Sequence, residues 1–130
     1  MAADGGRLMS TLAEARTQLA ELLDAVDGYR VRARPSSGTP KPGDGWVTIG
    51  RLAPSRFGGV TSVVLVAVLV FGADEVAAED RIEQDGAALL NATADMLSTD
   101  AALEPLTLIT GTNATPLYAA TLTLTTEVDS

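Results

Sequence analysis

Apolar residues recur near the start of the chain in steps of three and four, the spacing of one face of an α-helix. The recurring positions are Leu12, Ala15, Leu19, Leu22 and Val26. Thr11 and Glu14 stand where a capping box places its N-cap and N3 residues. Gly28 suits the position just past the end of a helix. The pattern therefore predicts an amphipathic helix that ends shortly before Gly28.

Alternation with a period of two then predicts strands at residues 29–34 and 46–52. The first strand places Tyr29, Val31 and Ala33 on one side, opposite Arg30, Arg32 and Arg34. The second places Trp46, Thr48 and Gly50 opposite Val47, Ile49 and Arg51. Between them, residues 35–45 are rich in Pro and Gly, and this extended loop is longer than a usual connection. We expect it to be an interaction loop.

Within residues 60–71, every position from 63 to 71 is apolar, so both sides of a strand there would be apolar, and many of these residues are β-branched. This predicts the central strand of the sheet, buried on both of its faces. The pattern offers only two helices to cover those faces. We expect either that the helices cover opposite sides of the sheet or that another subunit covers one side.

A second helix is predicted to begin after Asp74 and to reach about Leu97, with a looser apolar stripe that includes Val76, Ile82 and Leu89. Leu106–Thr110 predicts a short strand, and Gly111–Pro116 a connector. Residues 117–128 predict a long final strand with a row of threonines on one side.

The predicted element order is α-β-β-β-α-β-β, which indicates an α+β fold with two helices packed on a mainly antiparallel sheet. The 130 residues suit one domain, with residues 1–9 as a flexible lead. The longest apolar run spans nine residues, well short of the roughly 20 of a membrane helix. We therefore expect no membrane partner.

Charge is distributed unevenly along the chain. Residues 1–59 hold eight basic and six acidic side chains, whereas residues 60–130 hold one basic and eleven acidic ones. Halves of opposite sign suit a protein that meets copies of itself front to back, although both sets can also simply solvate the surface. The net charge of −8 argues against nucleic acid as a tight partner.

Candidates for catalysis are few. The chain has no His and no Cys, which removes imidazole acid–base chemistry, thiol nucleophiles and the usual zinc sites. The strongest acidic cluster consists of Glu75, Glu79, Asp80 and Glu83 at the start of the second helix. A solvated helix face explains it better than a metal site does, because nothing else converges on it. We expect no enzymatic activity and no cofactor.

Two stretches resemble the tail terminator proteins of long-tailed phages, especially those of actinobacterial hosts. They are the strand-to-acidic-helix junction "VLVAVLVFGADEVAAEDRI" and the closing strand "YAATLTLTTEV". Together with the element order, the resemblance covers nearly the whole chain. It implies a structural virion protein, assembled in the host cytoplasm, whose ring lies at the head-proximal end of the tail.

The resemblance also implies partners. Copies of the chain would form a hexameric ring that caps the tail tube protein, stops its polymerisation and meets the head–tail connector protein. DNA would pass through the ring without specific binding, past walls to which the excess acid contributes. A tail-completion or connector subunit is the alternative within this class. A small cytosolic ligand-binding α+β domain is the alternative outside it.

The charged segments yield one interface hypothesis. Arginines of the first half would face the acidic first turns of the second helix on the adjacent subunit. The candidate interface residues are Arg30, Arg32, Arg34, Arg51, Arg56, Glu75, Glu79, Asp80 and Glu83. Two other arrangements stay open: the arginines pair within their own subunit, or they contact the neighbour on the head side.

Overall fold

The computed structural model describes residues 11–35, 40–55, 58–96, 98–110 and 116–129. Its elements are α1 (Leu12–Asp24), β1 (Arg30–Arg32), β2 (Asp44–Pro54), β3 (Val60–Gly72), α2 (Glu75–Ala92), a 3₁₀ turn (Thr93–Asp95), β4 (Ser98–Thr110) and β5 (Pro116–Asp129). The predicted α+β fold and element order are confirmed. The lead of residues 1–9 and most of the 111–116 connector lie outside the described residues.

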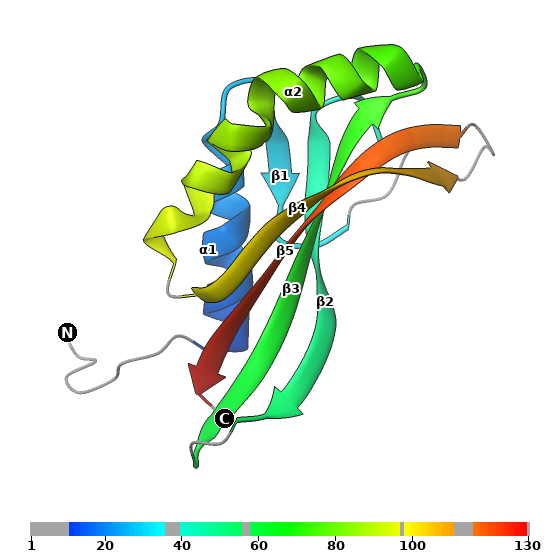
Figure 1. Ribbon diagram of the computed structural model, residues 1–130. Coiled ribbons are helices and arrows are strands. Elements are labelled where there is room, and N and C mark those ends of the chain that lie inside the picture. Colours follow the sequence, from blue (N-terminus) through cyan, green and yellow to red (C-terminus); the bar gives the residue numbers. More distant parts are fainter. Residues whose placement is uncertain (1–10, 36–39, 56–57, 97, 111–115, 130) are drawn as a thin grey trace.

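The five strands form one sheet in the order β1-β2-β3-β5-β4, with β3 at its centre (Figure 1). The edge strand β1 pairs in parallel with β2, and the other three pairs are antiparallel. Helix α2 carries the chain from β3 to β4, and β5 then fills the place between those two strands. The mainly antiparallel sheet is therefore as predicted.

Both helices pack on the same side of the sheet. The buried core joins α1 residues such as Leu19 and Leu23 to Leu89 of α2 and to Leu65 and Leu69 of β3. All five of these side chains are fully buried. Of the two alternatives, the one in which the helices cover opposite sides is therefore wrong, and no helix of the described residues lies on the other side of the sheet.

Helix α1 begins as the sequence predicts and ends earlier. The Thr11 hydroxyl accepts a hydrogen bond from the Glu14 amide at 3.2 Å, and the Glu14 carboxylate accepts one from the Thr11 amide at 3.0 Å. The helix ends at Asp24, whose carboxylate accepts a hydrogen bond from the Val31 amide at 2.9 Å. Val26 and Gly28 thus belong to the turn that leads into β1, where Gly28 has a φ of 88°.

Helix α2 is shorter than predicted and faces the sheet differently. Asp74 caps it, accepting a hydrogen bond from the Val76 amide at 3.0 Å, and it ends at Ala92 rather than near Leu97, which lies outside the described residues. Val76 is 69% exposed and so does not belong to the buried stripe. Small residues carry much of the packing instead: Gly86 is buried, and a Cβ there would lie 3.4 Å from Leu103.

Two strands differ from their predictions. Strand β4 begins at Ser98 rather than at Leu106, pairing with β5 along most of its length. In β2, the register with β3 shifts between Ile49 and Arg51. This bulge moves Arg51 off the core side of the strand, where simple alternation placed it. The strand also begins at Asp44, so the predicted loop is shorter, and residues 36–39 of it lie outside the described residues.

Candidate assembly interface

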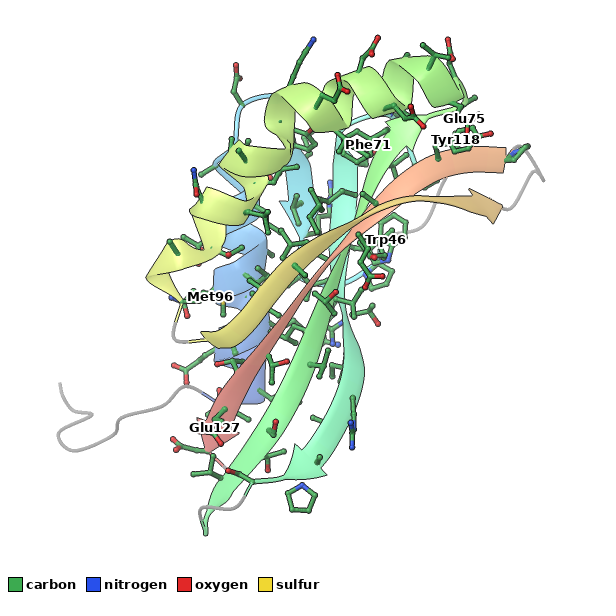
Figure 2. All side chains as sticks on the ribbon, viewed as in Figure 1. Trp46, Phe71, Glu75, Met96, Tyr118 and Glu127 are labelled. Carbon is green, nitrogen blue, oxygen red and sulfur yellow. The ribbon has the colours of Figure 1, made fainter. Side chains whose placement is uncertain are left out.

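The side of the sheet opposite the helices is the most distinctive surface of the fold, and we call it the open sheet face. Strand pairing places on it Arg32 of β1, Trp46, Thr48 and Arg51 of β2, Val64, Val66 and Val68 of β3, Thr121, Thr123 and Thr125 of β5, and Ala102 and Glu104 of β4. The three valines are half-buried by their neighbours on the face. Trp46 extends from the side of the sheet away from α1 (Figure 2).

One row of this face crosses all five strands. It runs Arg32, Trp46, Val68, Thr121, Glu104, each residue paired with the next. A cation therefore lies at the β1 edge and an anion at the β4 edge, with apolar and threonine side chains between them. The predicted threonine row is confirmed as part of this face, because Thr121, Thr123 and Thr125 stay half-buried while Leu122 and Leu124 enter the core.

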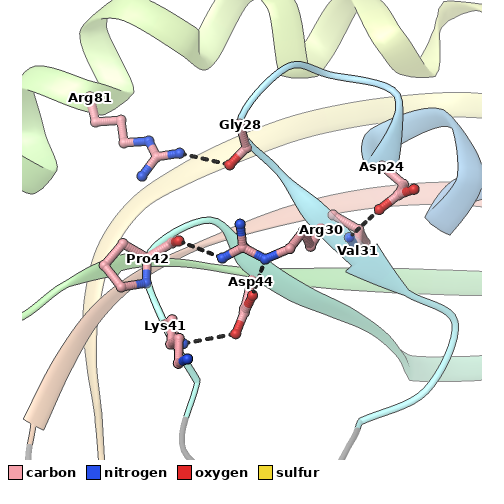
Figure 3. A network of polar contacts seen from close by, with 8 residues as sticks. All are labelled: Asp24, Gly28, Arg30, Val31, Lys41, Pro42, Asp44 and Arg81. Carbon is pink, nitrogen blue, oxygen red and sulfur yellow. Dashed lines mark hydrogen bonds and ion pairs between the residues drawn. The ribbon is translucent and has the colours of Figure 1, made fainter.

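Arg30, the first of the predicted interface arginines, is engaged within its own subunit. Its guanidinium donates to the Asp44 carboxylate at 2.9 Å and to the Pro42 carbonyl at 3.0 Å (Figure 3). The Lys41 amide donates to the other Asp44 oxygen at 2.8 Å. Partial burial by itself would raise the pKa of Asp44, but the Lys41 amide and Arg30 together hold it below its ordinary value. For Arg30, intrasubunit pairing is thus the arrangement found.

The other candidate arginines divide into three cases. Arg32 and Arg51 are exposed on the open sheet face, and neither makes a hydrogen bond or an ion pair within the described residues. Arg34 is exposed beyond β1 and lies near Arg16, whose pKa is lowered by burial and by the Arg34 charge. Arg56 lies outside the described residues. Among the described residues, Arg32 and Arg51 are thus cations on this face that have no partner within the subunit.

The acidic candidates lie on the other layer of the molecule. Glu75, Glu79, Asp80 and Glu83 are all exposed on α2, on the helix side of the sheet. Glu75, which is labelled in Figure 2, lies at the start of that helix, at the top of the molecule. The structure therefore brings Arg32 and Arg51 together on one layer and the four acids together on the opposite layer, and it does not join the two groups within a subunit.

In the described part of the chain, no group of three or more Asp and Glu side chains lies close enough together to hold a metal ion. No described helix is long and apolar enough to cross a membrane. A shallow hollow on the outer side of α1 is lined by that helix alone, at Ala13, Glu14, Thr17, Gln18 and Glu21.

A cluster around Arg81 was not anticipated as a unit. The Arg81 guanidinium lies 4.7 Å from the centre of the Tyr29 ring, donates to the Gly28 carbonyl at 2.9 Å and is 3.5 Å from the Asp85 carboxylate. Only the Arg81–Asp85 spacing of four residues was visible in the sequence. The cluster joins α2 to the turn before β1, so its evident effect is to fix one helix against the sheet.

The Tyr29 hydroxyl completes this cluster by donating to Asp85 at 2.7 Å. Burial, with a further contribution from this hydrogen bond, raises the pKa of Tyr29 well above its ordinary value. The phenol therefore stays protonated further into the alkaline range than an ordinary tyrosine. Its ring also makes an edge-on contact with Phe71, with centroids 6.1 Å apart.

Comparison with known proteins adds no assignment to this geometry. No protein-family model and no curated protein sequence matches the chain.

Proposed function

We propose that this chain is a phage tail terminator, a structural subunit whose copies close into a hexameric ring at the head-proximal end of the tail. The ring caps the tail tube protein, stops its polymerisation and offers a surface to the head–tail connector protein. DNA passes through the ring without specific binding. The proposal combines the resemblance of the sequence with the surfaces that the fold leaves uncovered.

The observation that carries the proposal is the centre of the open sheet face. Val64, Val66 and Val68 lie on the middle strand of the sheet, and both helices pack on the opposite side. A sheet face that meets only water usually alternates to polar residues at these positions. Valines there favour a surface that another protein covers.

The distribution of charge supports the same reading. Arg32 and Arg51, which pair with no described residue, lie on the open sheet face, and the exposed acids lie on the helix layer. Surfaces of opposite sign on opposite layers favour head-to-tail contacts between copies. Such contacts produce a ring when the rotation between neighbours closes.

The test is a capping experiment on the tail tube. Tube protein from the same virus is polymerised with increasing amounts of this chain, and tube lengths are measured by electron microscopy. We expect the mean length to fall at amounts far below one copy per tube subunit, because a terminator acts only at tube ends. A folded chain that leaves the length distribution unchanged would contradict the proposal.

The same experiment separates the alternatives. A chain that ignores tubes but binds the purified head–tail connector protein is a connector or completion subunit. A chain that ignores both and stays monomeric at high concentration favours the ligand-binding alternative. Val66→Asp, which places a charge at the centre of the open sheet face, serves as the matched variant and should not cap tubes.

A further inference from the structure

We infer that the open sheet face receives helix α2 of the next copy of the chain, seated over β1, β2 and β3. This inference rests on the proposed self-association of the chain, and it holds whether or not the assembly belongs to a tail. It names the two surfaces that meet and the direction in which copies follow one another.

The first surface is a stripe on the outer side of α2, which we call the acidic stripe. It consists of Val76, Glu79, Asp80 and Glu83, at positions i, i+3, i+4 and i+7 of the helix, so all four lie along one side. Val76 is 69% exposed although it is apolar. The three carboxylates make no hydrogen bond or ion pair within the described residues. The stripe thus combines an apolar contact with three unpaired negative charges.

The second surface supplies the matching groups. Arg32 lies in the row of Val68, and Arg51 is paired with Val64, so the two cations flank the three valines of β3. The four residue-to-residue steps from Val64 to Val68 span about 13 Å of strand. The seven residue-to-residue steps from Val76 to Glu83 span about 10 Å of helix. Arginine and glutamate side chains are long enough to make up the difference.

The far side of the open sheet face defines where the helix sits. Glu104 lies in the row of Arg32 and Val68 but at the β4 edge, where it repels an acidic helix. Favourable charge is therefore confined to the half of the face formed by β1, β2 and β3. The threonines of β5 therefore lie at the edge of the area that the helix covers, not beneath its centre.

The two surfaces lie on opposite layers of one subunit, so a contact between them is heterologous. Each copy offers its open sheet face to one neighbour and its acidic stripe to another, which yields a ring or an open chain of subunits. A face-to-face dimer, by contrast, would bury two open sheet faces together and leave α2 exposed. The two arrangements therefore predict different neighbours for Val66.

Cross-linking tests this difference directly, because the chain contains no cysteine. Val66→Cys and Val76→Cys are prepared as separate full-length variants, and a short bismaleimide is added to each and to their mixture. We expect a dimer band only in the mixture. Thr17→Cys, exposed on the outer side of α1, is the control partner and should give no band with Val66→Cys. A strong band from Val66→Cys alone, or none from the mixture, would overturn the inference.

Two charge variants test where the helix lies on the open sheet face, because they should change the strength of association in opposite directions. Arg32→Glu should weaken association at least about tenfold, since it replaces an attraction by a repulsion. Glu104→Lys should strengthen it, because a repulsion is removed. Both are measured by sedimentation at low and high salt, and high salt should reduce both effects. If Arg32→Glu and Glu104→Lys change the association equally and in the same direction, the helix lies elsewhere on the face.

Failure of the inferred interface can be told apart from failure of the proposed function. If the mixed cross-link forms and tubes are not capped, the inference stands and the tail role fails. If tubes are capped while the mixed cross-link is missing, the tail role stands and the ring uses other surfaces. Circular dichroism of every variant confirms folding, and Val66→Cys, which nearly preserves the volume of valine, guards against a loss of fold.

Discussion

Arg81 is the residue on which three parts of the fold converge. It extends from α2, lies over the Tyr29 ring at 4.7 Å and over the Phe71 ring at 6.0 Å, and donates to the carbonyl of Gly28. A guanidinium between two rings and a carbonyl has little freedom, so the start of β1 and the end of β3 are held together by one side chain from the helix layer.

Tyr29→Phe should alter the alkaline stability of the protein. The pKa of Tyr29 is raised in the folded state, so its contribution is complete below about pH 10, the ordinary value for tyrosine, and is lost as pH rises through the folded pKa. Above about pH 10, the free energy of unfolding of the wild type should therefore fall more steeply than that of Tyr29→Phe. Urea unfolding followed by circular dichroism measures both.

The control for that experiment is Tyr118→Phe. It removes the other tyrosine and keeps the hydrogen bond from Tyr29 to Asp85, so it should retain the steep alkaline fall. At neutral pH, Tyr29→Phe should lower the free energy of unfolding by about 1 kcal/mol, the usual value of one hydrogen bond. An identical alkaline slope in Tyr29→Phe and the wild type would disprove the role assigned to this phenol.

Gly43→Ala should be strongly destabilising. Gly43 has a φ of 93°, and a Cβ there would collide with the carbonyl oxygen of Gly28. Backbone strain at such a position costs about 1–3 kcal/mol, and the collision adds to it. Gly58→Ala is the matched control, because nothing lies within 4 Å of a Cβ at that position. Comparable melting temperatures for the two variants would contradict this account.

Some side-chain contacts follow from local spacing in the sequence, and others depend on how distant strands pair. The capping partners Thr11 and Glu14 were predictable, since their spacing is local. The engagement of Arg30 by Asp44 was not, because it depends on the parallel register that sets Arg30 opposite Asp44. Likewise, one extra residue in β2 at the bulge decides on which face Arg51 lies, and no local sequence pattern predicts the bulge.

At the scale of elements, α2 is held to the sheet by one narrow side. Leu89 is fully buried and Ala78 and Gly86 are buried beside it, whereas Val76 is exposed. The predicted stripe failed at Val76 because Ala and Gly carry little apolar signal although they determine how closely the helix approaches. The strand β4 was underestimated for a related reason: its first half, Ser98–Glu104, is mostly polar or small, and Pro105 argues against a strand.

Leu89→Ala and Val76→Ala should therefore have very different effects on the stability of the monomer. Leu89→Ala removes a fully buried side chain and should lower the free energy of unfolding by about 2–5 kcal/mol. Val76→Ala changes an exposed position and should stay within about 0.5 kcal/mol. Both are measured by chemical denaturation at low protein concentration, where subunits are separate. A large loss in Val76→Ala would mean that α2 faces the sheet differently.

At the scale of the whole molecule, the fold has two layers, one of helices and one formed by the sheet. A third layer would be needed to cover the second face of the sheet. The sequence predicted that both faces of residues 60–71 are apolar, and it left open whether two helices or another subunit covers the second face. Only the packing of Leu19 and Leu89 into one core decides this. Periodicity identifies the buried side of each helix but not the face of the sheet on which it lies.

Thermal stability should depend on protein concentration if copies cover one another. Anything that binds only the folded state stabilises it by mass action, so the melting temperature should rise as the protein is concentrated. Val66→Asp should abolish this dependence, and the charge at a half-buried strand position should also lower the melting temperature of the dilute protein. A melting temperature independent of concentration in the wild type would speak against self-association. Scanning calorimetry across a wide concentration range makes the measurement.

The position of Trp46 gives the protein an optical reporter of its own. It is the single tryptophan of the chain, and it lies in the row of Arg32 and Val68 on the open sheet face. Indole emission shifts to shorter wavelength when water around the ring is replaced by protein. The colour of its fluorescence therefore follows the covering of this face in real time, without a label, during assembly with any partner that itself lacks tryptophan.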